Sequence, residues 1–545
     1  MTFWRSLGFQ TEMNDVLDKP NFTLEELLDK GEFFITECKN QNQKLMAYLL
    51  QEDPLRKLVG YVVGVYDDEQ IEDEEETNQN RLTYARTCCE VLCQEDWALS
   101  NAVCENEGLL ELFWSFLERE DGLVGGLVSP FACRAASILL QRKIQECFDV
   151  LKSKENSLGM LLSKIGHSHV NELIQKVLQC DKSDSFGVLQ WLRDENFVGQ
   201  AIQKFSPQEP SCVHENMAMT LIEFFSPPSS EEVMSMMNLF EQEDNLGKMM
   251  DFIVNGVCAT ATYWGLHFVL ELLKRGVEMG GMMEHVPPEE LPTIIRISGQ
   301  YLKQIADILR EVLVGEDGDD RRITSSFGKV VPLRSYRLKA LEFLAVLLSA
   351  RNNWVDEQFI DSQIFEICVQ LFFTYHWNNF LHSCVSDIIM PFLEEREMGL
   401  VFEVLFARCL LGEKIIQADE ENSEAVESQM VSSRGYMGFL NKIANQIVAM
   451  EGKNPNFRSL LENHVPGWSN YVNGSLKKHN EMYSVILGGQ KPIGDDSGMS
   501  LDESGGPEDE EDLEAICTQY SVVQGFSEPT FGYGGWEGEE EGRGG

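Results

Sequence analysis

The feature that most constrains the fold of this chain is a helical spacing of apolar residues, which continues over more than 450 residues with almost no strand pattern. Thr23 and Glu26 form a capping box, so a helix is predicted to begin there. Leu24, Leu27 and Leu28 fall on one face of that helix. Similar runs recur downstream in Leu338, Leu341, Leu344, Ala345 and Leu348, and in Phe380, Leu381, Cys384, Val385, Ile388, Ile389 and Phe392. Proline and glycine separate the runs, which predicts many helices joined by short breaks.

So many helices without strands predict an all-α fold, and the leading architecture is an α-solenoid of stacked helical hairpins of the HEAT or armadillo type. No exact repeat is visible, and a compact multi-domain α protein is the alternative. The helical-repeat domain is expected to cover residues 1–490. Residues 491–545 hold 15 acidic and two basic residues among many glycines, so a disordered acidic tail is predicted there.

The charge balance narrows the possible partners. The chain has 44 Lys+Arg and 89 Asp+Glu, a formal net charge of −45. Nucleic acids and anionic membranes are therefore disfavoured as partners, because both are bound through fields of Lys and Arg. No stretch approaches the roughly 18 apolar residues of a membrane-spanning helix, so no membrane insertion is expected. The N-terminus reaches Glu12 and Asp15 too soon for a signal peptide. We expect an intracellular protein, cytoplasmic or also nuclear.

Charge is also distributed unevenly along the chain. Asp67–Glu76 contains eight acidic residues in ten and is expected to be a solvated loop, and Glu316–Asp320 is a second acidic loop. Directly after it comes a stretch with no acid and six basic residues, namely Arg321, Arg322, Lys329, Arg334, Arg337 and Lys339. This basic island could pair with the acidic loop within the chain, or it could dock an acidic protein surface.

Catalytic and metal-binding patterns are absent from the sequence. His167 and His169 come nearest to a metal pair, but a zinc site needs three or four ligands and no second pair follows. Nucleophile-elbow, Walker A, kinase, HExxH and dinucleotide signatures are also missing. We therefore expect a non-catalytic protein with no catalytic residue, cofactor or metal. An enzyme using the two histidines on a metal is the remote alternative.

The sulfur-containing residues are expected to belong to the core. The 14 cysteines are scattered through apolar sequence, unlike a dense disulfide framework, and are predicted to be reduced thiols. Cys88, Cys89 and Cys93 share one predicted helix. Methionines cluster at 234–237, 249–250 and 282–283, where they are expected to fill gaps between helices.

Several short blocks occur in a fixed order along the chain. The most specific is WNNFLH at Trp377–His382. The others are Phe3–Arg5, Thr23–Leu28 followed by Glu37–Leu45, Glu107–Leu117, Pro332–Leu338, and Arg434–Leu440 with Ile443–Asn445. Together these blocks resemble the SAPS-domain family, the regulatory subunits of protein phosphatase 6 and of its fungal counterpart. The resemblance spans residues 3–487. Asp67–Glu76 and Ala259–Met283 match poorly, and Arg334-Ser335-Tyr336 stands where the family has GNT.

The resemblance implies a helical-repeat subunit that binds the catalytic subunit of a two-A-like phosphatase of the protein phosphatase 6 type and directs its substrate choice and location. Family members in animals also pair with ankyrin-repeat subunits, and whether this chain does so stays open. A generic α-solenoid adaptor without a phosphatase is the alternative function. The charge of −45 further predicts that the chain steers its phosphatase toward basic substrates.

The blocks also supply candidate partner-binding residues, which are Arg334, Arg337, Trp377, Asn378, Asn379, His382 and Tyr436. Trp377, Phe380 and Leu381 are expected to be buried, with Asn378 or Asn379 capping the next helix. Asn379 and His382 are expected to face a partner together with Arg334 and Arg337. Tyr436 could either pack inside the chain or anchor a partner. Gly438, in the same turn, is expected to let two helices approach closely.

Overall fold

A computed structural model describes residues 12–65, 74–94, 98–119, 129–180, 185–226, 230–256, 258–313, 323–325, 328–427 and 433–484. The chain divides into two units, Met1–Met482 and Tyr483–Gly545, and the fold described below is that of the first. Several predicted features lie outside the described residues: the tail at 491–545, the acidic loop at 316–320, residues 67–73 of the other acidic loop, Phe3–Arg5, and Arg321 with Arg322. Glu74–Glu76 form the start of helix α6, so the predicted loop at 67–76 is wrong for these three residues. The boundary near residue 490 stays a prediction.

Helices make up most of the described residues. The N-terminal helices are α1 (Glu12–Leu17), α2 (Leu24–Leu28), α3 (Glu32–Lys39), α4 (Gln43–Leu49), α5 (Glu52–Val63), α6 (Glu74–Leu92), α7 (Ala98–Cys104), α8 (Glu107–Trp114) and the 3₁₀ turn η2 (Ser115–Leu117). The central helices are α10 (Ser129–Arg142), α11 (Ile144–Ser153), α12 (Ser157–Ser163), α13 (Ser168–Gln179), α14 (Val188–Asp194), α15 (Phe197–Gln203), α16 (Ser211–Phe225), α17 (Glu231–Phe240), α18 (Glu243–Met250), the π-helical turn η3 (Asp251–Asn255) and α19 (Ala259–Gly280).

The remaining elements complete the stack. They are the 3₁₀ turn η4 (Pro288–Glu290), α20 (Thr293–Gln300), α21 (Leu302–Arg310), β1 (Ile323–Ser325), β2 (Gly328–Val330), α22 (Ser335–Leu348), α23 (Asn353–Asp361), α24 (Ile364–Thr374), α25 (Asn379–Glu395), α26 (Met398–Val401), the π-helical η5 (Phe402–Arg408), α27 (Leu411–Glu427), α28 (Met437–Lys453), α29 (Pro455–His464), α30 (Trp468–Tyr471), the π-helical η6 (Val472–Leu476) and α31 (Lys477–Tyr483). The strands β1 and β2 form one antiparallel hairpin, with Ile323 opposite Val330.

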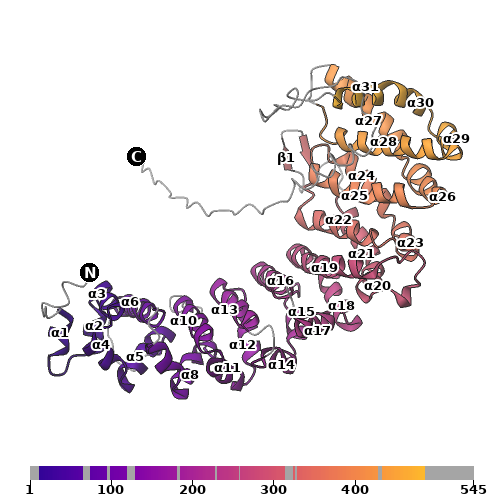
Figure 1. Cartoon of the computed structure of the whole chain (residues 1–545). Helices are drawn as coiled ribbons and strands as arrows, with labels where there is room; N and C mark the ends of the chain where they lie inside the picture. The colour runs from indigo at the N-terminus through magenta and orange to yellow at the C-terminus, as the bar shows by residue number, and fades with distance from the viewer. Residues whose placement is uncertain are drawn as a thin grey trace, which may run out of the picture. The chain divides into compact units, whose positions relative to one another are not determined.

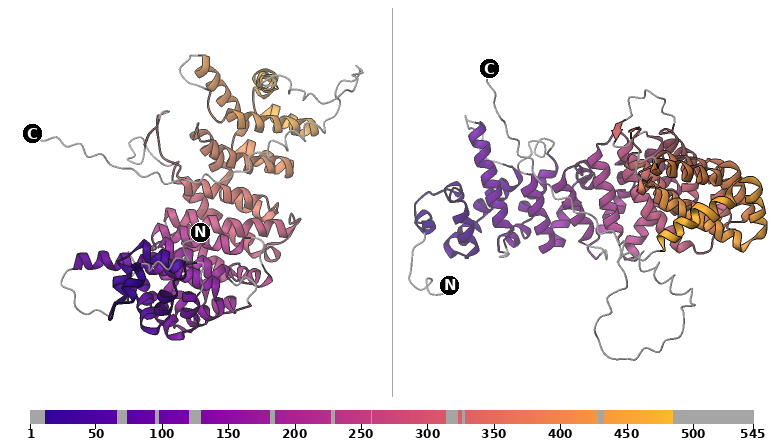
Figure 2. Two further views of the ribbon diagram at one scale, coloured as in Figure 1. Left: turned by 60° about the vertical axis from the view of Figure 1, so that its left-hand side comes forward. Right: turned by 90° about the horizontal axis from the view of Figure 1, so that it is seen from above.

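From α10 onward the helices repeat in groups of three. The first helices of the groups are α10, α13, α16, α19, α22, α25 and α28, and each packs against the next (Figure 1). The third helices of neighbouring groups also pack against each other: α12 packs on α15, α15 on α18 and α21 on α24. Figure 2 shows the same succession of helices from two further directions. The predicted all-α stack is confirmed, and its unit is the helix triplet of armadillo repeats.

The helical spacing read from the sequence produces this packing. In α21 the buried residues Leu302, Ile305, Ala306 and Leu309 lie at positions i, i+3, i+4 and i+7, which form one stripe along a helix. Each stripe is covered by the neighbouring helices, so the core runs continuously through the stack. Among the described residues, no helix is both long and apolar enough to cross a membrane.

Several local predictions can be compared with the structure. Thr23 caps α2 by accepting a hydrogen bond from the Glu26 backbone N–H at 3.3 Å, as predicted. Cys88 and Cys89 are buried free thiols, which confirms that they belong to the core. The methionines at 236–237, 249–250 and 283 are also buried. Met234 is only partly buried, and for Met282 the prediction is wrong, because this residue is 99% exposed.

Candidate functional site

Three of the sequence blocks meet at one edge of the stack, where α22, α25 and α28 begin. We call this the motif edge and define it as residues 331–338, 376–382 and 433–439. The Tyr375 hydroxyl, at the end of α24, donates to the Val331 carbonyl at 2.7 Å. The Gly435 N–H donates to the His376 carbonyl at 3.0 Å. Segments far apart in the sequence are therefore joined by direct hydrogen bonds.

Gly435 allows the closest approach within this edge. A Cβ atom at this position would lie 3.0 Å from Asn379 Oδ1, 3.2 Å from the His376 carbonyl oxygen and 3.4 Å from Trp377 Cε3. Gly438 lies in the first turn of α28, and a Cβ there would meet nothing within 4 Å. The prediction that Gly438 permits the close contact was therefore wrong, and Gly435 has that role.

Arg337 is buried rather than partner-facing, with 4% of its surface exposed. Its guanidinium donates to the Ile308 carbonyl at 2.8 Å, to the Leu333 carbonyl at 3.4 Å and to the Glu311 carboxylate at 2.7 Å. It also stacks over the Tyr336 ring at 4.6 Å. These contacts fasten the start of α22 to the end of α21. The expectation that Arg337 faces a partner is therefore wrong, because its donors are used inside the chain.

Arg334 is exposed at the N-cap position of α22 and forms no ion pair with the described residues. Its backbone has φ 63° and ψ 155°, a region that is populated almost only by glycine and costs a side-chain-bearing residue about 1–3 kcal/mol. This geometry explains why glycine belongs at this position in the pattern that the chain resembles. An arginine is held there against a conformational cost, and its cation is directed to solvent.

His382 and Tyr436 are both fully buried, so neither faces a partner in this chain. The His382 ring lies 4.8 Å from that of Phe372, 5.7 Å from Tyr436 and 6.0 Å from Phe439. Burial lowers the pKa of His382 to about 4, although the backbone carbonyls of Tyr375 and Phe372 oppose the shift. His382 is therefore a neutral member of the core at physiological pH. The expectation that it faces a partner is corrected.

Tyr436 packs rather than anchors, and Arg434 holds its hydroxyl. The guanidinium of Arg434 donates to the Tyr436 hydroxyl at 2.8 Å and pairs with Glu421 at 2.9 Å. Burial is the main reason that the pKa of Tyr436 is raised. The Asn422 side chain accepts a hydrogen bond from the Arg434 backbone N–H at 2.8 Å. Arg434 and Asn422 were not predicted as members of the site, although Arg434 begins one of the sequence blocks.

The WNNFLH block turns between α24 and α25 and supplies the exposed part of the edge. Asn378 caps α25 by accepting from the Leu381 N–H at 3.1 Å, which confirms the capping prediction. Leu381 is buried and Trp377 is half-buried, whereas Asn379 is exposed. Phe380 is 66% exposed, so its predicted burial is wrong. The core face of α25 begins at Leu381, and Phe380 lies one position outside it.

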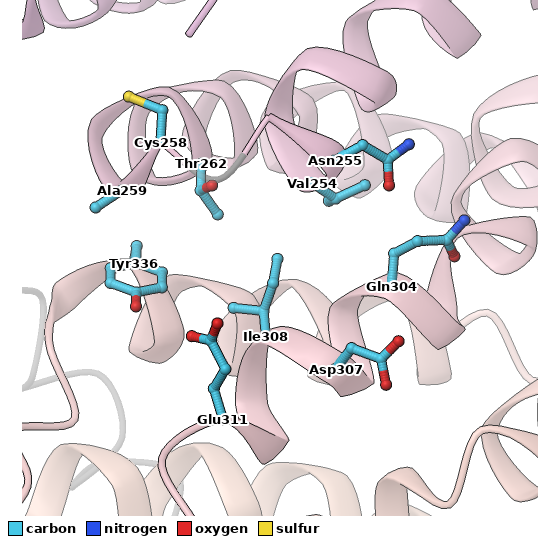
Figure 3. Close-up of a pocket in the computed structure, with 10 residues that line it drawn as sticks. All are labelled: Val254, Asn255, Cys258, Ala259, Thr262, Gln304, Asp307, Ile308, Glu311 and Tyr336. Carbon is cyan, nitrogen blue, oxygen red and sulfur yellow. The ribbon is translucent and has the colours of Figure 1, made fainter. Parts of the chain in front are cut away.

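A hollow of about 380 Å³ lies beside the motif edge, between the start of α19 and α21. Figure 3 shows Cys258 and Thr262 on one wall, with Asp307, Glu311 and Tyr336 on the other. Glu311 is the partner of Arg337, so this wall is shared with the motif edge. The pKa of the Cys258 thiol is lowered overall. Burial is the largest single effect and acts to raise this pKa, but the hydrogen bonds with the Thr260 side chain and with the backbone N–H groups of Ala261 and Thr260 together outweigh burial.

The chemistry that these groups can perform is recognition. Within the part of the chain that the structure describes, no three His, Cys, Asp or Glu side chains are placed to hold a metal ion. His167 is the N-cap residue of α13 and His169 lies in its first turn. The motif edge instead offers an exposed aromatic ring, an exposed arginine and a half-buried tryptophan on a rigid support. Such residues commonly dominate protein–protein contacts.

Comparison with known proteins gives a consistent result. The profile of the SIT4 phosphatase-associated protein family, SAPS, matches residues 136–485. Serine/threonine-protein phosphatase 6 regulatory subunit 3 of Gallus gallus is 26% identical over 524 residues, covering 89% of this chain and 59% of that protein. Regulatory subunit 1 of Mus musculus is 25% identical over 532 residues, covering 89% and 61%. Extragenic suppressor of kinetochore protein 1 of Schizosaccharomyces pombe is 21% identical over 706 residues, covering 96% and 84%. The chain thus spans about three fifths of the length of the vertebrate relatives.

Proposed function

The chain belongs to the SIT4 phosphatase-associated protein family, and from this membership we propose that it is a non-catalytic regulatory subunit of a Ser/Thr phosphatase. Its partner is the catalytic subunit of a protein phosphatase 6-type enzyme, whose substrate choice and location it directs. The observation that carries the proposal is the family match across residues 136–485, together with relatives named as regulatory subunits. An armadillo-type stack supports such a role, because repeats of this kind present long surfaces to other proteins.

The exposed residues of the motif edge are proposed as a contact for the catalytic subunit. Phe380 and Trp377 supply apolar area, Arg334 supplies a cation, and Asn379 supplies an amide. Their backbones are fixed by caps and by the hydrogen bonds that join the three blocks. Little conformational entropy is then lost when a partner binds, which favours affinity. Arg337, His382 and Tyr436 contribute by supporting this surface from below.

Binding of the full chain to a purified protein phosphatase 6-type catalytic subunit tests the proposal. We expect Phe380→Ala to weaken binding by about ten-fold or more, as for an aromatic hot spot, and Arg334→Glu to weaken it further. Tyr483→Ala removes an aromatic ring that is 61% exposed on α31 and serves as the matched control. It should bind like the wild type.

The alternative interpretation is an adaptor of the same fold without a phosphatase. It takes over if the wild-type chain, folded by circular dichroism, binds no catalytic subunit. If the wild type and Phe380→Ala bind equally, the function stands and the contact lies elsewhere. An ankyrin-repeat subunit is a further proposed partner, and native mass spectrometry of the complex would reveal it as an additional mass.

A further inference from the structure

The segment that joins α19 to α20 presents apolar side chains to solvent. We call residues 279–290 the methionine loop; it begins in the last turn of α19, which Figure 1 labels, and continues to the 3₁₀ turn η4. Met282 is 99% exposed and Met279 is 79% exposed, the two highest values among the large apolar residues that the structure describes. Methionine is normally a core residue, so two such exposed side chains on one short segment need an explanation.

The methionine loop is firmly anchored despite this exposure. The buried Asn352 side chain donates to the Met283 carbonyl at 2.6 Å and to the Val286 carbonyl at 2.9 Å. The Asn353 N–H donates to the Glu284 carbonyl at 3.1 Å. Met283 itself is buried, with its side chain against Gly280. The backbone is therefore fixed directly after the point where Met282 projects into solvent, and α19 ends at Gly280 shortly before that point.

The surroundings of the two methionines are acidic. Between residues 277 and 292 the chain has no Lys or Arg. Its four carboxylates, all exposed, are Glu278, Glu284, Glu289 and Glu290. The nearby cations are engaged elsewhere. Arg351 pairs with Glu395, Arg396 pairs with Asp356, and Lys274, one turn before Met279, pairs with Glu271. Arg275 also lies one turn before Met279, and its guanidinium is turned to the sulfur atoms of Met234 and Met237. The loop thus combines adaptable apolar side chains with an acidic rim.

We propose that the methionine loop is a docking site for Lys/Arg-rich protein segments that carry a bulky apolar side chain. The apolar side chain packs against Met279 and Met282, whose unbranched thioethers adapt to different shapes. The carboxylates attract the flanking cations and reject acidic segments. Because the loop is already ordered, binding costs little loop entropy. In one respect this inference rests on the proposed function: if the chain directs a phosphatase, the docked segments belong to its substrates.

Fluorescence anisotropy with labelled peptides and the full chain tests the docking site. The probe is a Lys/Arg-rich peptide with one central Phe, and the controls are the same peptide with Ala in place of Phe and an acidic peptide with Phe. We expect only the first to bind the wild type well, and added salt to weaken it. Met279→Ser with Met282→Ser should weaken binding at least about five-fold. Met482→Ser changes a methionine that is 60% exposed on α31 and should have no effect.

Equal affinity of the wild type and the double variant for the probe would overturn the proposal. So would equal binding of the Ala and Phe peptides, since charge alone would then explain the affinity. A wild type that dimerises in light scattering, with a monomeric double variant and no peptide effect, would assign the loop to a second copy instead. The double variant should still bind the catalytic subunit. Loss of peptide binding alone therefore reports on the loop, and loss of catalytic-subunit binding by the wild type reports on the proposed function.

Discussion

The burial of His382 predicts that stability falls as the pH is lowered below the ordinary titration range of histidine. In the folded chain the pKa of His382 is about 4, whereas an exposed histidine in the unfolded chain titrates near 6.5. Between these values the unfolded chain binds a proton that the folded chain does not. The stability contribution is therefore complete above about pH 6.5 and is lost progressively as the pH falls toward about 4.

The magnitude follows from the two pKa values. At about pH 5 an exposed His382 would be almost fully protonated and the buried one almost fully neutral. The resulting difference is about 1.5 pH units of proton affinity, or about 2 kcal/mol. His382→Phe replaces the ring by another aromatic ring among Phe372, Tyr436 and Phe439. It removes this titration while leaving His376 and the carboxylates unchanged.

Urea unfolding of the wild type and of His382→Phe, each at about pH 7.5 and about pH 5, measures the effect. The wild type should lose about 2 kcal/mol more than the variant between the two conditions. Repeat arrays can unfold in parts, so hydrogen exchange of the α25 amides provides a local reading of the same quantity. If both proteins lose the same free energy and α25 exchanges equally in both, His382 does not titrate as its burial requires and the reasoning is refuted.

Three further predictions concern the supports of the site. Arg337→Ala should destabilise the chain by about 2–4 kcal/mol in urea unfolding, because it leaves the Ile308 and Leu333 carbonyls without their donor. Glu311→Gln changes a carboxylate that is 59% exposed and should cost less than about 1 kcal/mol. Equal costs for the two variants would contradict the assigned role of Arg337. Gly435→Ala should lower the free energy of unfolding by about 1–3 kcal/mol, because the new Cβ meets the His376 carbonyl. Gly438→Ala should leave the free energy of unfolding unchanged or raise it. A greater loss of stability for Gly438→Ala than for Gly435→Ala would show that the contact is misassigned. Cys258 should be alkylated by iodoacetamide well before the buried Cys368, as measured by peptide mass spectrometry, because burial raises the pKa of Cys368 and hydrogen bonds lower that of Cys258. Thr260→Ala should slow the alkylation of Cys258. An unchanged rate would exclude the Thr260 hydroxyl as the cause of the lowered pKa.

The repeat fold could be read from the sequence because its signal is local. Leu24, Leu27 and Leu28 are buried as their spacing predicts, and Thr23 caps the helix. The triplet unit could not be read, because which helices pack together depends on breaks of variable length, such as the insertion between α21 and α22 that holds β1 and β2. The blocks likewise did not determine which of their members face solvent.

The errors at the motif edge have a common physical cause. Arg337 and His382 are polar, and sequence alone favours an exposed position for such residues. Burial became possible because partners from distant segments, Glu311 and the aromatic rings around His382, satisfy or enclose them. Phe380 shows the opposite case, since an apolar residue next to the core stripe of α25 is exposed. The burial of Arg337 and His382 was decided by tertiary contacts that local spacing does not contain, whereas Phe380 is exposed because it lies outside the core face of its own helix.

Hydrogen exchange of the full chain, with and without a purified protein phosphatase 6-type catalytic subunit, tests the central claim most directly. The catalytic subunit should slow exchange in residues 331–338, 376–382 and 433–439 and leave exchange in the methionine loop unchanged. Phe380→Ala should weaken that protection at equal protein concentrations. Protection confined to other segments, or none at saturating concentration of the catalytic subunit, would contradict the claim that the motif edge binds a phosphatase.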